Sequence, residues 1–150
     1  MNIYFVCTGN TCRSPMAEAI LKAKQLPNVS IRSAGIYALE GGEMSVNAQR
    51  VLNDENIPHS HTSRQVTGED IEWADVILTM TTAHKELLLH SFEAAAQKTY
   101  TLKEYVTPYT ALDVSDPFGG DLHTYKQTFY ELQHLIEELV QKQEGGTNSE

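Results

Sequence analysis

Two cysteines lie close together in the segment "CTGNTCRSP", which runs from Cys7 to Pro15, and no other cysteine occurs in the chain. The Gly9 and Asn10 pair tolerates left-handed backbone conformations, so a loop here can turn successive backbone N–H groups inward around an anion. Arg13 adds a planar fork of donors that matches two oxygens of a phosphate group. These residue types at this spacing predict a binding loop for a tetrahedral dianion.

Cys7 is the candidate nucleophile of this loop. The donors that would hold a phosphate would also stabilise a thiolate, and a thiolate beneath a bound phosphoryl group can attack phosphorus. Ser14 could donate a hydrogen bond to the same sulfur. Pro15 suits the first position of a helix, whose positive end would then also point at the anion. The alternative is that Cys7 is a small apolar residue that ends a buried strand.

Strands and helices are expected to alternate along the chain and to position this loop. Apolar, β-branched and aromatic runs predict strands at residues 2–7, 29–35, 74–80 and 98–102. Helical spacing and capping residues predict a short helix after Thr67 and longer helices at 14–26, 45–56, 83–92 and 122–139.

This alternation predicts a single α/β domain, residues 1–143, with a central four-stranded parallel sheet and helices on both faces. Residues 144–150 are expected to be a disordered tail. Ligands of such folds bind beyond the carboxyl ends of the strands. The loop after the first strand is therefore the expected site.

The bulk composition narrows the possible partners and location. The formal net charge of −9 disfavours binding to nucleic acid or to an anionic membrane, because both bind mainly basic surfaces. No apolar stretch is long enough to cross a bilayer and the first residues lack the pattern of a signal peptide, so we expect a cytoplasmic protein. In that reducing compartment, two close cysteines are expected to be reactive or metal-binding rather than bridged.

The segment 7–15 resembles the phosphate-binding loop of the low-molecular-weight protein tyrosine phosphatase family. Similar segments follow in the family's order, and they are "SAG" at 33–35, "HTSRQVT" at 61–67, "ADVILTM" at 74–80 and "DPFGG" at 116–120. The resemblance covers nearly the whole domain and implies the family fold. No metal or other cofactor is expected, because thiolate, arginine and backbone amides already supply the electrostatics. Cys7 would form a phosphocysteine, Arg13 and the loop amides would hold the phosphoryl oxygens, and Asp116 would protonate the leaving group and then activate water.

Further residues are expected to support the loop. The resemblance assigns a polar network that holds the loop in its strained shape to Asn10, Ser14, Ser33 and His61. A loop wound about an anion could bring Cys12 near Cys7, so that an oxidised Cys7 is trapped as a reversible disulfide, and the resemblance supports this redox role. A metal site at His59 and His61, or a zinc or thioredoxin-like cysteine pair, is disfavoured because further ligands and the Cys-x2-Cys spacing are missing.

Two positions bear on the substrate. Position 11 is Thr where many tyrosine phosphatases of the family have an aliphatic residue, and Phe118 is followed by Gly119 where they commonly have paired aromatic residues. The combination resembles the bacterial protein-arginine phosphatase branch. This resemblance implies hydrolysis of phosphoarginine on proteins, with Asp116 pairing with the guanidinium and with Phe118 and the loop 36–42 as walls. The residues expected around the substrate are Thr8, Gly9, Asn10, Thr11, Cys12, Ser14 and Phe118.

Hydrolysis of phosphotyrosine by the same mechanism is the main alternative. An arsenate reductase would need further cysteines to relay the oxidation, and the chain has none beyond Cys7 and Cys12. A phosphoprotein-binding module without catalysis would not need both Cys7 and Asp116, and a sugar-transport phosphocarrier would have no use for the segment 116–120. The expected partners are therefore phosphorylated proteins.

Overall fold

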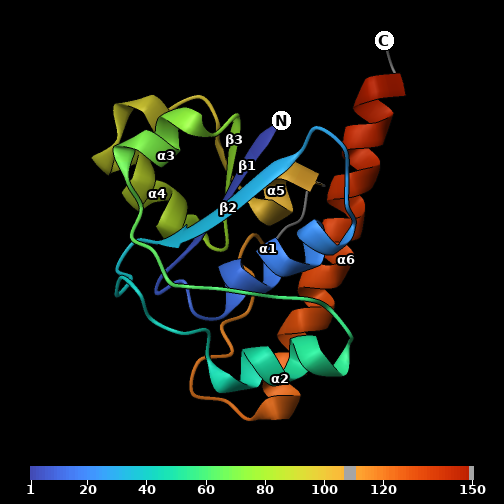
Figure 1. Ribbon diagram of the computed structural model, residues 1–150. Coiled ribbons are helices and arrows are strands. Elements are labelled where there is room, and N and C mark those ends of the chain that lie inside the picture. Colours follow the sequence, from blue (N-terminus) through green and yellow to red (C-terminus); the bar gives the residue numbers. More distant parts are fainter. Residues whose placement is uncertain (107–110, 149–150) are drawn as a thin grey trace.

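The computed structural model describes residues 1–106 and 111–148, and its centre is a parallel sheet with the strand order β2-β1-β3-β4 (Figure 1). The strands are β1 (Asn2–Cys7), β2 (Ser30–Gly35), β3 (Val76–Thr79) and β4 (Thr99–Thr101). Each strand coincides with an expected run or lies within it, because some runs extend beyond the residues that pair. The expected four-stranded parallel sheet is confirmed.

Helices follow the strands, and several begin at a capping side chain. They are α1 (Arg13–Ala23), α2 (Val46–Asp54), α3 (Gly68–Trp73), α4 (Thr82–Ser91), α5 (Leu102–Val106) and α6 (Leu122–Asn148), with a short 3-10 helix at Glu93–Ala95. The hydroxyl groups of Ser45, Thr67 and Thr81 each accept a backbone N–H in the first turn of α2, α3 and α4. The cap at Thr67 was predicted. The helix α5 and the 3-10 helix were not, because they are too short to show a helical period.

The final helix is longer than its apolar period predicted. α6 continues to Asn148, so most of the segment 144–150, expected as a disordered tail, is helical, and residues 149–150 lie outside the described part. The Gln and Lys residues at 141–143 favour helix, whereas Gly145 and Gly146 do not, so propensity accounts for the helix as far as residue 144 and not for its last turn. The domain boundary at residue 143 remains a prediction.

Helices cover both faces of the sheet, as Figure 1 shows. Alternate side chains of β1 point to opposite faces. Ile3, Phe5 and Cys7 pack with α1, α2 and α6, whereas Tyr4 and Val6 pack with α3 and α4. All five side chains are buried. Cys7 therefore ends a central strand on the face that α1 covers, and the loop after it starts from a rigid base.

The strand order places this loop where the connections of the sheet diverge. β1 lies between β2 and β3, so the connection after β1 leads to one edge of the sheet and the connections after β3 lead to the other. Open α/β sheets bind ligands where their connections diverge in this way, beyond the carboxyl ends of the strands. The loop after β1 and the start of α4 after β3 meet at this point.

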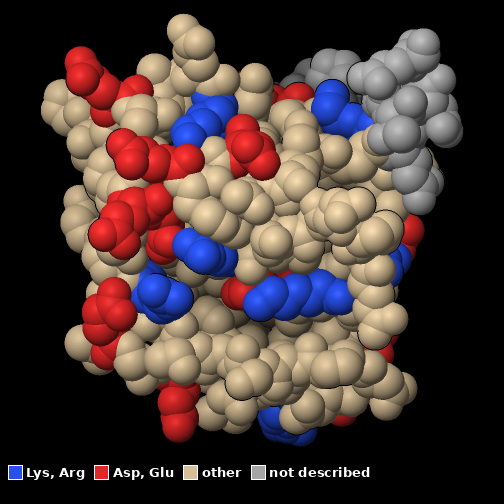
Figure 2. Space-filling view, turned by 45° about the horizontal axis from the view of Figure 1, so that its top comes forward, with Lys and Arg blue, Asp and Glu red and all other residues tan. Residues whose placement is uncertain are grey.

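The visible surface is acidic on one side. Figure 2 shows acidic side chains gathered toward the left of that view, with Lys and Arg side chains among them and across the middle of the face. This distribution agrees with the formal net charge of −9. Among the described residues, every helix is too short or too polar to span a lipid bilayer.

Candidate active site

The loop of residues 8–12 turns the chain from the buried end of β1 into α1. The sequence predicted Pro15 at the first position of the helix. In the structure α1 begins at Arg13, so Pro15 is its third residue. The shift has no cost, because the amides of a first helical turn lack acceptors within the helix. The helix ladder starts after the proline, where Met16 N donates to the Cys12 carbonyl at 3.1 Å.

A cavity of about 220 Å³ lies over the loop. It brings together the three residues expected to be catalytic and most of those expected around the substrate, and its lining is Cys7, Thr8, Gly9, Thr11, Cys12, Arg13, Asp116 and Phe118. Asn10 and Ser14 are fully buried behind the loop and support it from within. None of the described residues 36–42 lines the cavity, so the second wall predicted from this loop is not found there. This segment is linked to the loop through the backbone, where Tyr37 N donates to the Thr8 carbonyl at 2.9 Å.

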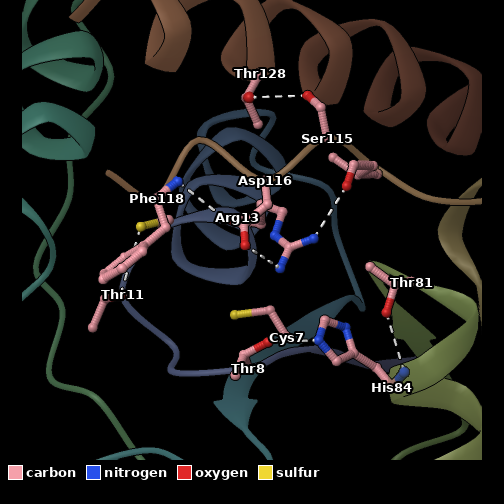
Figure 3. A network of polar contacts seen from close by, with 12 residues as sticks. Cys7, Thr8, Thr11, Arg13, Thr81, His84, Ser115, Asp116, Phe118 and Thr128 are labelled. Atoms are coloured by element: carbon pink, nitrogen blue, oxygen red, sulfur yellow. Dashed lines mark hydrogen bonds and ion pairs between the residues drawn. The ribbon is translucent and has the colours of Figure 1, made fainter. Parts of the chain in front are cut away.

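Arg13 and Asp116 lie next to each other on one side of the cavity, and Cys7 lies on the opposite side (Figure 3). The Arg13 guanidinium is buried and donates to the Val114 carbonyl at 3.1 Å, and its Nη2 lies 3.6 Å from Asp116 Oδ2. Asp116 is more than half exposed, and its other oxygen accepts the backbone N–H of Phe118 at 3.0 Å. Arg13 is therefore held rigidly, whereas the Asp116 carboxylate is open to solvent and to an incoming ligand.

Ser14 is a close polar partner of the candidate nucleophile. Cys7 Sγ lies 2.9 Å from Ser14 Oγ, and both groups are buried. A hydroxyl at this distance can donate to a thiolate and stabilise it, both before attack and when sulfur leaves again. The expected contact between Ser14 and the nucleophile is therefore present in the structure.

Asn10 holds the loop in its strained shape. Its φ of 56° is a left-handed conformation, which persists in a non-glycine residue only when the surroundings enforce it. Asn10 Nδ2 donates to Ser14 Oγ at 2.9 Å and to Ser33 Oγ at 3.0 Å, and its Oδ1 accepts the Arg64 backbone N–H at 3.0 Å. The structure thus joins Asn10, Ser14 and Ser33 in one network, as the family resemblance implied.

Two further side chains fix the Asn10 carbonyl from the segment after α2. His61 Nε2 lies 2.7 Å from this oxygen, and Ser63 Oγ donates to it at 2.8 Å. His61 was expected in the network, and Ser63 was missed because no sequence pattern marks a serine in an extended segment. Gly35 at the end of β2 is also required, because a Cβ there would lie 2.5 Å from the Thr8 carbonyl oxygen.

Cys12 lines the same cavity as Cys7 and contacts α6. Its sulfur lies 3.3 Å from Tyr125 Oη and 3.6 Å from Ser45 Oγ, and both cysteines are free thiols. Burial and the contact with Cys12 raise the pKa of the Tyr125 hydroxyl above its ordinary value. A disulfide between Cys7 and Cys12 would require Cys12 to leave Tyr125, and the redox role of Cys12 remains a prediction.

His84 is a residue of the site that the sequence did not predict. It lies in the first turn of α4, is almost fully buried, and its Nε2 is 2.8 Å from the hydroxyl oxygen of Thr8, the residue after the nucleophile (Figure 3). Burial, and to a smaller extent the positive charge of Arg13, lower the His84 pKa to about 4. The imidazole is therefore neutral throughout the physiological pH range.

Histidine and acidic residues do not gather into a metal site in the described chain. No group of three or more His, Cys, Asp or Glu side chains there could hold an ion. The two histidines weighed as a metal pair have separate partners, because His59 contacts Asn53 Oδ1 at 2.9 Å and His61 contacts the Asn10 carbonyl.

The geometry agrees with a comparison against protein families. A family model described as low molecular weight phosphotyrosine protein phosphatase matches residues 2–146. The chain belongs to this family.

Two curated relatives and two solved structures illustrate the similarity to the low-molecular-weight phosphatases. A protein-arginine-phosphatase of Geobacillus stearothermophilus is 49% identical over 140 residues, covering 93% of this chain and 94% of the relative. The low-molecular-weight protein-tyrosine-phosphatase PtpB of Staphylococcus haemolyticus is 42% identical over 139 residues, covering 93% and 97%. The structure of the YwlE arginine phosphatase from Geobacillus stearothermophilus superposes with a TM-score of 0.95 at 46% identity, covering 99% of this chain and 96% of that one. A YwlE C7S mutant with a phosphorylated active-site serine has a TM-score of 0.91 at 44% identity, with 95% of each chain covered.

The neutral His84 of this low-molecular-weight phosphatase predicts a pH-dependent stability. An ordinary histidine pKa is 6.5 and the folded value is about 4, so between these values the unfolded chain binds a proton that the folded chain does not. The free energy of unfolding should therefore fall as the pH is lowered from 6.5 to 4, by at most about 3 kcal/mol. His84→Gln should remove this part of the pH dependence. Urea unfolding at several pH values tests this, with exposed His90→Gln on the same helix as control, and equal slopes for wild type and His84→Gln would contradict it.

Proposed function

We propose that the protein hydrolyses phosphoarginine on proteins through a phosphocysteine intermediate. The observation that carries this proposal is the common cavity of Cys7, Arg13 and Asp116, with Cys7 at the end of a buried strand and a guanidinium and a carboxylate opposite. Family membership and the protein-arginine phosphatase among its relatives support it. The roles given to the individual site residues below are proposed from the geometry of this cavity.

The reaction proceeds in two displacements. The Cys7 thiolate attacks phosphorus, the P–N bond of phosphoarginine breaks, and Asp116 gives its proton to the leaving nitrogen. Arg13 and the loop amides bind the equatorial oxygens and stabilise their charge. A water molecule then attacks the phosphocysteine, Asp116 takes its proton, and the S–P bond breaks to release phosphate and restore the thiolate. Ser14 stabilises that thiolate through its hydrogen bond.

Thr11 and Phe118 support phosphoarginine as the substrate. Thr11 lines the cavity, and its hydroxyl lies 3.6 Å from Cys12 Sγ, a long contact that leaves it able to bind a polar guanidinium. Phe118 is largely exposed at the rim and offers one flat apolar face. Phosphotyrosine is the second candidate, because the tyrosine phosphatase PtpB is also a close relative and the Phe118 ring could stack on a phenyl group.

Comparison of kcat/KM on phosphoarginine and phosphotyrosine peptides tests the proposal. We expect wild type to prefer phosphoarginine, and Thr11→Ile to lower kcat/KM for that substrate by about 10- to 100-fold while phosphotyrosine is accepted as well or better. Thr11→Val is the matched control, because it removes the hydroxyl and adds no bulk. A wild-type preference for phosphotyrosine would overturn the substrate and leave the phosphatase mechanism in place.

The remaining features of the proposal concern the cell. Phosphorylated proteins in the cytoplasm are the proposed partners, and no cofactor has a step in the mechanism. We also propose that, when a peroxide oxidises the Cys7 thiolate to a sulfenic acid, the Cys12 thiol attacks that sulfur, the S–O bond breaks with release of water, and a Cys7–Cys12 disulfide forms. Release of Cys12 from Tyr125 would accompany this step.

A further inference from the structure

His84 lies in α4 and contacts the loop of residues 8–12, which follows β1. It lies in the first turn of α4, which follows β3, and its Nε2 reaches Thr8 Oγ1 at 2.8 Å after β1 (Figure 3). The first turn of α4 is itself fixed, because Thr81 Oγ1 accepts the His84 backbone N–H at 3.1 Å and Asp113 Oδ1 accepts that of Thr82 at 2.8 Å. The backbone that carries His84 is therefore held in place independently of Thr8.

The other ring nitrogen decides where the imidazole proton lies. His84 Nδ1 is buried and, within the described residues, has no hydrogen-bond partner. An N–H left unpaired there would lose its hydrogen bond to water, whereas a lone pair is favoured by the nearby positive charge of Arg13. We therefore infer that the proton is on Nε2 and that His84 donates to the Thr8 hydroxyl oxygen.

This hydrogen bond leaves the hydroxyl hydrogen of Thr8 available. Among the described residues, Thr8 Oγ1 makes no other hydrogen bond than the one with His84, and the Thr8 carbonyl is already occupied by Tyr37 N at 2.9 Å. Thr8 also lines the cavity next to Cys7. An acceptor that enters this cavity can therefore take the free hydrogen.

We propose that Thr8 donates its hydroxyl hydrogen to an oxygen of the bound phosphoryl group and that His84 is the positioning residue that directs this hydrogen into the cavity. The proposal rests on the phosphatase function proposed above. It also explains why a histidine lies here. Burying an unpaired ring nitrogen costs free energy, and a purely apolar side chain at this position would avoid that cost. A hydrogen bond to a dianion is also among the stronger ones a hydroxyl can make.

A double-mutant cycle with inorganic phosphate as the probe tests the proposal. Thr8→Val removes the hydroxyl at nearly constant shape and should raise the Kd for phosphate about tenfold or more, measured by calorimetry. His84→Met should raise Kd several-fold in the wild-type background and have no further effect in the Thr8→Val background, because His84 acts only through this hydroxyl. Thr8→Ser and His84→Gln should keep Kd near wild type, since each retains the required group.

Control variants distinguish a histidine that directs the Thr8 hydroxyl from one that only supports the fold. His90→Met, an exposed change on the same helix, should leave Kd unchanged. A merely structural His84 would lower phosphate affinity equally in both Thr8 backgrounds, and that result, or an unchanged Kd in His84→Met, would overturn the proposal. Turnover by the wild type tests the proposed function separately, since a wild type that binds phosphate but hydrolyses no phosphopeptide contradicts that function and not the Thr8 contact.

Discussion

Cys7→Ala is expected to lower kcat by roughly four orders of magnitude or more on phosphoarginine and phosphotyrosine peptides alike. The variant lacks the sulfur that must attack phosphorus, and no other side chain in the lining of the cavity can replace it at that position. Cys12 lies in the same lining, but its sulfur contacts Tyr125 and Ser45. The effect should fall on kcat for both substrates, because both reactions share the phosphocysteine step.

The phosphate cradle should survive this substitution. Arg13 keeps its bond to the Val114 carbonyl and Asn10 keeps its network, and neither depends on the Cys7 sulfur. Cys7→Ala should therefore bind inorganic phosphate by calorimetry while it fails to turn over. Acid quench of wild type during turnover, followed by mass spectrometry, should find the phosphoryl group on Cys7. Ordinary activity in Cys7→Ala, or a phosphoryl group on another residue, would refute the mechanism.

Much of the fold follows from local patterns. β1 and β3 are continuous apolar runs that suit strands buried on both faces, and the hydroxyl cap at Thr67 marks where α3 begins. The pattern did not find α5, because a helix of one turn has no period to detect. The apolar period of the final helix stops at Leu139, and the Gln and Lys residues that follow continue the helix on propensity, but no local pattern predicts helix over Gly145 and Gly146.

The loop residues of the site could be predicted because their chemistry is local in sequence. Residues 7–14 combine nucleophile, turn and guanidinium in one stretch, and family resemblance added Asp116, Ser33 and His61. Ser63 and Tyr125 were missed, because their roles arise only when distant segments pack together. His84 had one usable signal: it begins the helix after β3, and parallel strands bring their carboxyl ends to the same edge of the sheet.

Asp116→Asn is expected to lower kcat by about 10²- to 10⁴-fold, the second largest effect among these variants. In the structure Asp116 is the exposed carboxylate that faces Arg13, with one oxygen oriented by the Phe118 amide. Asparagine can keep that contact but can neither give nor take the proton. Both displacements should therefore slow, and the loss should be largest for phosphoarginine, whose nitrogen leaves poorly unless it is protonated.

An activated substrate separates the two steps that Asp116 serves. With 4-nitrophenyl phosphate the leaving group needs no proton, so Asp116→Asn should form the phosphocysteine rapidly and then break it down slowly, because no base activates the water. Stopped-flow measurement should show a burst of nitrophenolate equal to the enzyme concentration, followed by slow turnover. Asp113→Asn is the matched control: Asp113 lies on the same segment but accepts from Thr82 at the start of α4, a contact that Asn can retain. A burst in Asp113→Asn and none in Asp116→Asn would transfer the acid and base role to Asp113. Unchanged kinetics in both Asp113→Asn and Asp116→Asn would show that neither carboxylate acts as the acid or base.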